Sequence, residues 1–497
     1  MSIQRGLMFL FLTFVCLLLS ACSPNGSTSE GDINENKETV IELWGYQDVL
    51  NGEGPAVKVI NEFNEKNKGK ISVNVRYIAK SEYNTAIQAA VASNDLPDIF
   101  HTPDGADIRK IIDNGWIQPI NNIVSQEWID AFDKGSFVEG INKINGQIYS
   151  YPQKGLEYAD MLYYNVDVLK DAGYNAPPKT WAELREMSKT ITEKGNGEKY
   201  GIVFAFSELG FLQNKIRPLA AGSDPEIGSV QNGINWRTGK YVYDEPIWQE
   251  TLGFIKLLKE DGSLLPSSYT IKRSEAYVML GEGKVGFMID QRSRMWLIKR
   301  DVPDANFNMA PVPTKDGSTP YLMGSIAENV GFVVNKNTPN PEAAGAVIEA
   351  LGSKEYFKEF IKSGVALSPM SELNKDESLY PYPEFKTFYD LHMKHVRIEP
   401  DPAIRNPEVS KVIQKLGSLN QNKIKPNINE IIQMYVSKDN YDLEKALSDL
   451  NDKLNKGLEA AIKEVSSEGI DVSKDDFIFP NWDPTQDYLE ENYQALQ

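Results

Sequence analysis

The residues from 40 to 115 alternate between short apolar runs and amphipathic segments, and this order limits the possible folds more than any other feature. Three apolar runs predict strands, namely VIELWGY (40–46), ISVNVRYIA (71–79) and LPDIF (96–100). Helices are predicted at 55–67, at 81–95 with Ser81 as its cap, and around ADIRKIIDNG, with Gly115 as its stop. Strands and helices that alternate in this way indicate a mostly parallel sheet covered by helices, so we predict an α/β fold.

A second series of the same kind follows the extended segment IYSYPQ (148–153). ADMLYYNVDVLKDAG (159–173) predicts a strand and then a helix that ends at Gly173, and Thr180 is expected to cap the next helix. YGIVFAF (200–206) then predicts a buried strand. The roughly 460 residues after position 39 are too many for one core, so we expect two or more domains.

The N-terminus has the pattern of a secretory signal. Arg5 precedes an apolar run from Leu7 to Leu19, which is shorter than the ~20 residues that span a bilayer. The run ends in LSAC, which resembles a bacterial lipobox, so we expect cleavage before Cys22 and a lipid on that residue. The alternative is an ordinary signal peptide with a chance cysteine. Residues 23–39 are polar and are expected to form a flexible tether that reaches roughly 20–25 Å.

Charge and cysteine content exclude several classes of site. The formal net charge is −18, which argues against a nucleic-acid surface and also, more weakly, against a strongly anionic ligand. Cys16 lies in the predicted signal, so the mature chain keeps only Cys22. We therefore expect no disulfide, no zinc site and no thiol nucleophile.

The stretch GEGKVGFMID (281–290) contains the glycine pattern of a dinucleotide-binding loop. Such a loop follows a strand and opens a helix, whereas here a predicted helix, SEAYVML, precedes the glycines and a predicted strand, KVGFMID, follows them. Gly281 and Gly283 are expected to end the helix with left-handed backbone, and Gly286 to lie in the strand. The order predicts a turn and no cofactor.

No metal site is expected either. His392 and His395 can share a helix face, but nothing nearby in the sequence completes a metal site. In TEKGNGEKYG (192–201) side-chain oxygens come only from Glu193, Asn196 and Glu198, whereas calcium takes six to eight oxygens. Carboxylates are numerous in the chain, so a two-carboxylate glycosidase stays open as an alternative.

Several segments together, in this order and spacing, resemble the family 1 extracellular solute-binding proteins of bacterial carbohydrate ABC importers, the relatives of maltose-binding protein. The resemblance runs from about residue 40 to 370, and more loosely to 465. It rests on the lipobox, IELWGY, ASNDLPDIF, IYSYPQKGLEYADMLYYNVDVLKDAG, PPKTWAELREMSKTI, LGEGKVGFMID, NVGFVVNKNTPNPEAAGAVIEAL and SGVALSPMS.

The resemblance implies a two-lobe periplasmic-binding-protein-like fold with a hinge and a cleft between the lobes. The implied division is a signal peptide at 1–21, a lipid anchor and tether at 22–39, an N-lobe from 40–150 plus 328–370, a C-lobe from 154–323 plus 375–465, and a C-terminal tail at 466–497. The lobes should be joined at IYSYPQ and near GSIAENVGF. The leucines of 443–458 are expected in one helix packed on its own lobe, with a coiled-coil arm as the alternative.

The implied function is capture of an oligosaccharide and its delivery to the permease subunits of an ABC importer. The protein would be a monomer on the extracellular face of the bacterial cytoplasmic membrane, held only through lipid on Cys22, without cofactor, metal, nucleic acid or enzymatic activity. The alternatives are a secreted, lipid-anchored carbohydrate-active enzyme and a lipoprotein that presents sugar to a membrane sensor.

Sugar rings require aromatic faces and hydrogen-bonding side chains. The family's ligand-contacting glutamate falls at Tyr158, beside Glu157, and the loop after the strand that GKVGF begins supplies Asp290, Arg292 and Trp296. The full predicted set is Trp44, Tyr46, Gln47, Tyr83, His101, Asp104, Glu157, Tyr158, Phe206, Trp236, Asp290, Arg292, Trp296 and Ser325. Trp116, Trp128, Trp181, Trp248 and Trp482 are expected to pack internally. Asp290→Ala is expected to weaken ligand binding while the fold survives.

Overall fold

The computed structural model describes residues 38–103, 108–155, 160–227, 233–324, 331–364, 366–420 and 424–496. The predicted signal peptide, Cys22 and the tether up to residue 37 lie outside the described residues, as do Asp104, Glu157, Tyr158 and Ser325. Residues from Glu38 to the C-terminus form one compact unit. None of its described helices combines the length and the apolar character needed to cross a membrane.

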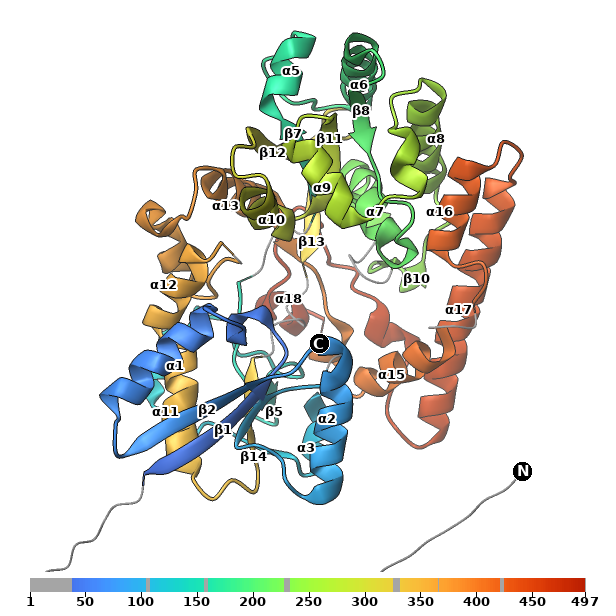
Figure 1. Ribbon diagram of the computed structural model, residues 1–497. Coiled ribbons are helices and arrows are strands. Elements are labelled where there is room, and N and C mark those ends of the chain that lie inside the picture. The colour runs from blue at the N-terminus through green and yellow to red at the C-terminus, as the bar shows by residue number, and fades with distance from the viewer. Residues whose placement is uncertain are drawn as a thin grey trace, which may run out of the picture. The chain divides into compact units, whose positions relative to one another are not determined.

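The first sheet has five strands in the order β2-β1-β3-β14-β4. Figure 1 labels β2, β1 and β14 of this sheet. They are β1 (Thr39–Gly45), β2 (Ile71–Tyr77), β3 (Ile99–His101), β14 (Phe332–Asn335) and β4 (Ile117–Gln118). As predicted, β1 lies parallel to both β2 and β3. The strand β14, which enters the sheet from a distant part of the chain, is antiparallel to β3 and β4.

Helices cover both faces of this sheet. Those of the first series are α1 (Pro55–Lys66), α2 (Lys80–Ser93) and α3 (Ile108–Asp113), and α11 (Pro341–Leu351) and α12 (Lys354–Lys362) pack beside α1. The Ser81 cap was wrong, because α2 begins at Lys80 after Ala79 and no side chain caps it. Gly115, with a φ of 72°, lies two residues beyond the last residue of α3.

The second sheet has four strands in the order β12-β7-β11-β8. They are β12 (Phe307–Ala310), β7 (Asp160–Asn165), β11 (Val285–Gln291) and β8 (Tyr200–Val203). Its helices include α5 (Val166–Ala172), α6 (Trp181–Gly195), α7 (Leu212–Ser223), α8 (Pro246–Glu260), α9 (Arg273–Gly281), α10 (Ser293–Asp301) and α13 (Glu384–His395). Gly173 and the Thr180 cap are confirmed: Gly173 has a φ of 96°, and Thr180 forms a capping box with Glu183.

The C-terminal part of the chain forms further helices. They are α14 (Pro402–Arg405), α15 (Val409–Asn420), α16 (Ile428–Ser437), α17 (Leu443–Ser467) and α18 (Glu490–Gln494). Four of the predicted α17 leucines, Leu443, Leu447, Leu450 and Leu458, are buried in the core of the second sheet, so α17 packs on its own chain. Phe479 and Trp482 of the C-terminal segment join the same core.

The glycine turn of 281–286 follows the predicted order, with one correction. Gly283 has a φ of 71°, as expected after the helix α9, and Gly286 lies inside β11. Gly281 is instead the last helical residue and does not have left-handed backbone. A larger residue at position 281 would be crowded, because an added Cβ would lie 3.0 Å from the Cβ of Val302.

Three stretches of chain that join the two sheets are hydrogen-bonded to one another. The backbone N–H of Gly331, just before β14, donates to the carbonyl of Tyr151 over 2.8 Å, and the Ser150 hydroxyl donates to the carbonyl of Phe332 over 3.1 Å. The N–H of Gly155 donates to the carbonyl of Leu367 over 2.8 Å. The segment 149–155, here called the first crossing, is therefore held by both of the other stretches.

Candidate functional site

Three predicted site residues meet where β1 and β3 end. Tyr46 follows β1, Tyr83 comes from α2, and His101 is the last residue of β3. The ring centroid of Tyr46 lies 4.7 Å from that of Tyr83 and 5.3 Å from that of His101, and the Tyr83 hydroxyl donates to the His101 carbonyl over 2.7 Å. Tyr83 and His101 are buried, so Tyr46 is the member of the group with accessible surface.

Two cations lie over the neighbouring aromatic rings. The guanidinium of Arg76, on β2, is 4.4 Å from the Trp44 ring centroid, and Lys80 Nζ is 5.7 Å from the Tyr46 ring centroid. Trp44 and Gln47 are both half-buried. The end of β1 therefore presents aromatic rings with cations on their faces, which is an arrangement favoured by the negative ring face.

His101 lies beneath Tyr46 and does not reach the surface. Its Nε2 atom is 3.2 Å from the amide nitrogen of Gln153, which can only donate, so the contact assigns the ring proton to Nδ1. Its ring stacks on Phe332 at 4.0 Å between centroids. Burial lowers the pKa of His101 to about 3, so the imidazole is neutral at ordinary pH. The sequence places His101 just after the third strand, whereas in the structure it is the last residue of that strand, with its side chain buried against Gln153 and Phe332.

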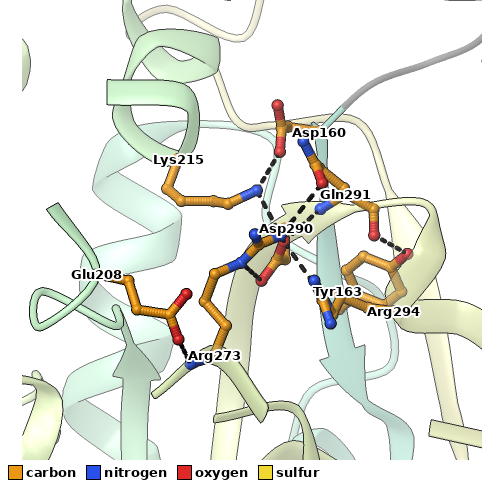
Figure 2. Close-up of polar contacts among 8 residues, drawn as sticks. All are labelled: Asp160, Tyr163, Glu208, Lys215, Arg273, Asp290, Gln291 and Arg294. Atoms are coloured by element: carbon orange, nitrogen blue, oxygen red, sulfur yellow. Dashed lines mark hydrogen bonds and ion pairs between the residues drawn. The ribbon is translucent and has the colours of Figure 1, made fainter. Parts of the chain in front are cut away.

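A buried ionic cluster lies at the ends of β7 and β11, the two central strands of the second sheet (Figure 2). The Nζ atom of Lys215, on α7, lies 2.5 Å from Asp160 Oδ1 and 2.7 Å from Asp290 Oδ1. These carboxylates come from the start of β7 and the end of β11, which meet because the two strands are antiparallel. Arg273 of α9 adds a guanidinium nitrogen 2.7 Å from Asp290 Oδ1, and Arg294 of α10 adds one at 3.4 Å.

Further polar contacts hold the same cluster in place. Arg273 also donates to Gln291 Oε1 over 3.2 Å, and its backbone N–H donates to Glu208 over 2.7 Å. Burial opposes ionisation of Asp290, but the charges of Lys215, Arg273 and Arg294 outweigh it and lower the pKa of Asp290 to about 2. The cluster thus holds two carboxylates among three basic side chains, away from water.

Asp290 lies at the strand end where the sequence placed it, but its oxygens are used inside the protein. The residue is 3% exposed, and the cavity beside it has a volume of about 10 Å³, room for a single water molecule. In this arrangement Asp290 presents no oxygen to a sugar-sized ligand. The physical reason is the cost of burying Lys215 and Arg273, which requires a carboxylate beside them.

The remaining predicted contacts are scattered. Phe206 is fully buried against Tyr269, and Trp236 is buried with its indole N–H donating to Glu399 over 2.9 Å. Arg292 and Trp296 are half-buried at the start of α10, with the Arg300 guanidinium 4.9 Å from the Trp296 ring. Asp104, Glu157, Tyr158 and Ser325 lie outside the described residues, so their roles stay predictions.

Most of the tryptophans expected to pack internally do so. Trp128, Trp181, Trp248 and Trp482 are buried, and Trp116 packs partly buried against the first sheet. Sequence reasoning missed Asp160, Lys215 and Arg273 as a charged cluster. One feature of the sequence indicates that Lys215 is buried. It lies in the apolar helical stretch NKIRPLAA, together with the buried Arg217 and before Pro218.

Within the described ranges, no group of three or more His, Cys, Asp or Glu side chains is arranged to hold a metal ion. Of the segment 192–201 considered for calcium, Asn196 and Gly197 have left-handed backbone just after α6. Lys194, at the end of that helix, donates to the carbonyl of Ala172 over 2.9 Å. The segment has the geometry of a helix-ending turn.

Comparison with known proteins identifies the relatives of this chain. The sequence profile of the bacterial extracellular solute-binding proteins matches residues 51–356. The chain belongs to this family. Its curated relatives include the sn-glycerol-3-phosphate-binding periplasmic protein UgpB of Agrobacterium fabrum, 25% identical over 291 residues, and a putative binding protein of Brucella abortus, 24% identical over 274 residues. The matches cover 57% and 54% of this chain but only 63% and 61% of those proteins, respectively.

Solved structures of other binding proteins have a similar fold. The sugar-binding protein MalE from Xanthomonas citri aligns with a TM-score of 0.60 at 18% identity, over 87% of this chain and 100% of that one. Unliganded RafE from Streptococcus pneumoniae aligns with a TM-score of 0.62 at 16% identity, over 85% and 98%. The predicted α/β, two-lobe periplasmic-binding-protein-like fold is confirmed. The predicted bounds of the two lobes stay a prediction.

Proposed function

We propose that this solute-binding protein captures an oligosaccharide between its two lobes and delivers it to the permease subunits of an ABC importer. The aromatic group at the end of β1 carries the proposal. Tyr46 and Trp44 are half-buried and separated by one residue in the chain, and the ring of Tyr46 packs on Tyr83 and His101. Aromatic faces held in this way suit the apolar C–H faces of pyranose rings. Solved relatives include RafE in complex with raffinose and GacH in complex with acarbose.

A neutral sugar fits the second sheet better than the phosphate ester named for UgpB. Lys215 is already paired with two carboxylates, and Arg273 with one of them, at 2.5 to 2.7 Å. A phosphate placed beside these cations would compete with Asp290 and repel it. The net charge of −18 acts in the same direction.

The arrangement of Asp160 and Asp290 argues against a glycosidase active site at the buried ionic cluster. A glycosidase needs one protonated carboxyl group and one ionised carboxylate, both in contact with the sugar. Asp160 and Asp290 are 2% and 3% exposed, both contact Lys215, and the pKa of Asp290 is lowered to about 2. The sensor alternative keeps the same binding site, and neighbouring genes for two permease subunits would favour import over sensing.

The binding proposal is tested by thermal unfolding of the purified mature chain with raffinose, maltotriose and sn-glycerol 3-phosphate. A ligand at 100 times its Kd adds about 2.7 kcal/mol to the free energy of unfolding. We expect an oligosaccharide to raise the melting temperature and to be recovered uncleaved. Stabilisation by sn-glycerol 3-phosphate alone would overturn the sugar assignment, and catalytic cleavage of the oligosaccharide would support the enzyme alternative.

We further propose that the protein is a monomer on the extracellular face of the cytoplasmic membrane, anchored by a lipid on Cys22. The apolar run before LSAC supports this proposal. Mass spectrometry of the protein from bacterial membranes should find a chain that starts at Cys22 and carries acyl groups. In Cys22→Ser the acyl groups and the membrane association should both be lost. An acyl-free chain in the wild-type membrane fraction would refute the anchor.

A further inference from the structure

His101 contacts two of the three stretches of chain that join the two sheets, at Gln153 and at Phe332. Its Nε2 atom accepts from the Gln153 amide at 3.2 Å, near the end of the first crossing. Its ring stacks on Phe332 at 4.0 Å and an interplanar angle of 16°, and Phe332 is both the first residue of β14 and the register partner of His101. One side chain therefore touches both stretches on the first-sheet side.

The position of the imidazole is tightly constrained. His101 and Gln153 are 2% and 5% exposed, and a Cβ added to Gly45 would lie 2.6 Å from His101 Nδ1. Within the described chain, Nδ1 has no hydrogen-bond partner. Burying this nitrogen without a partner costs stability, and a phenyl ring would not have that cost. Its contact with Gln153 is the property that a phenylalanine at this position would lack.

The same ring also lies next to the proposed sugar contact. The Tyr46 ring centroid is 5.3 Å from that of His101, and Tyr83, which packs on Tyr46, donates to the His101 carbonyl over 2.7 Å. Movement of Tyr46 on ligand binding would therefore press directly on the residue that contacts both stretches. No intermediate side chain is required to connect them.

We propose that His101 is a hinge-positioning residue, which holds Gln153 and Phe332 in the lobe arrangement seen here and is contacted by the ligand-binding side chain Tyr46. The purpose of this device rests on the proposed function, since lobes that rearrange around a ligand need a defined equilibrium between their arrangements. A buried hydrogen bond made in only one arrangement changes the ratio of two arrangements by about five- to tenfold.

The test measures the distance between the lobes without any ligand. Spin labels at Glu62→Cys on α1 and Glu260→Cys on α8, both exposed positions, are used in a chain that also carries Cys16→Ser and Cys22→Ser. His101→Phe keeps a ring against Phe332 but removes the nitrogen acceptor, and Gln153→Leu removes the donor. In each variant the weight of the main wild-type distance, relative to others, should fall about five- to tenfold.

A matched control separates this role from loss of stability. His395 is equally buried, at 3% exposed, and its Nδ1 lies 2.9 Å from the carbonyl of Pro320 on the other side of the crossings. His395→Gln should weaken folding without changing the distance distribution. The double variant His101→Phe/Gln153→Leu should shift the distribution no more than either single variant, because both remove the same bond.

Three results would overturn the proposal: an unchanged distribution in both single variants, an equal shift in His395→Gln, or shifts that add in the double variant. Because the measurement needs no sugar, it is independent of the binding experiment. If the hinge proposal fails, the sugar-binding proposal is unaffected. If the protein does not bind sugar, the distance measurement still tests the hinge proposal.

Discussion

The ammonium group of Lys215 lies 2.7 Å from Asp290 Oδ1, and both side chains are almost completely buried at the end of β11. The pair joins α7 to the second sheet, and Asp160 and Arg273 complete it. Removing one member leaves charges without compensation in a dry environment, which costs far more than the loss of a surface pair. This relationship changes what substitution of Asp290 is expected to do.

Asp290→Ala should lower the free energy of unfolding by about 3–5 kcal/mol, in place of the intact fold expected from the sequence. Urea denaturation followed by circular dichroism measures the change. The control is Asp449→Ala, which breaks an exposed i,i+4 pair with Lys445 and should change the stability little, because water and salt screen exposed pairs. If Asp290→Ala were as stable as this control, the cluster would not be the buried network described above.

Trp44 and Trp236 should respond in opposite ways to substitution. Trp44→Ala removes a half-buried ring at the end of β1 and should weaken oligosaccharide binding by about tenfold. Trp236→Phe removes the indole N–H that donates to the buried Glu399, and should cost about 1–3 kcal/mol of stability while affinity is kept. Calorimetric titration and urea denaturation of both variants measure these effects. Reduced affinity in Trp236→Phe with full stability would place Trp236 in the site.

The three histidines predict an acid-sensitive fold. Burial lowers the pKa of His101 to about 3 and of His392 to about 4, and it also lowers that of His395. The unfolded chain binds these protons below about pH 6.5 and the folded chain does not, so stability is full above pH 6.5 and decreases as the pH falls toward 4. The lowered pKa of Asp290 adds a loss only below about pH 4.

Urea denaturation at intervals between pH 7.5 and 5 checks this prediction. His101 and His392 each contribute a slope of at most about 1.4 kcal/mol per pH unit. In His101→Phe the slope of the free energy of unfolding against pH should decrease by at most about 1.4 kcal/mol per pH unit, the contribution of one proton. A free energy of unfolding that is constant over this range would contradict the lowered pKa values of the histidines.

Gly283→Ala should destabilise the protein by about 1 kcal/mol or more, because Gly283 has a φ of 71° that an alanine adopts only with strain. Gly253, inside α8, is a suitable control, since an added Cβ there meets nothing within 4 Å. Gly253→Ala should be neutral or stabilise by up to about 1 kcal/mol. Equal effects of the two substitutions on the melting temperature would refute the requirement for a left-handed turn at Gly283.

The sequence alone predicted the local elements, because local elements depend on local patterns. The alternation of strands and helices, the Thr180 capping box, the stop at Gly173 and the helix–glycine–strand order before Asp290 were all visible in short windows. The order of segments also indicated the family and its two-lobe fold. Ser81 and Gly281 show the limits, since helix ends shift by a residue or two without changing the pattern.

Only the tertiary structure decided which side chains are available to a ligand. Asp290 was correctly placed at a strand end, yet its charge is paired with Lys215 of α7, 75 residues earlier in the chain. Phe206 was expected to end a strand, but β8 stops at Val203, and the Phe206 ring is covered by Tyr269. Contacts between distant segments leave no trace in a local pattern, because any buried carboxylate needs a cation from wherever the fold brings one. For the same reason the sequence showed His101 at a strand end, and the structure showed that it joins Gln153 to Phe332.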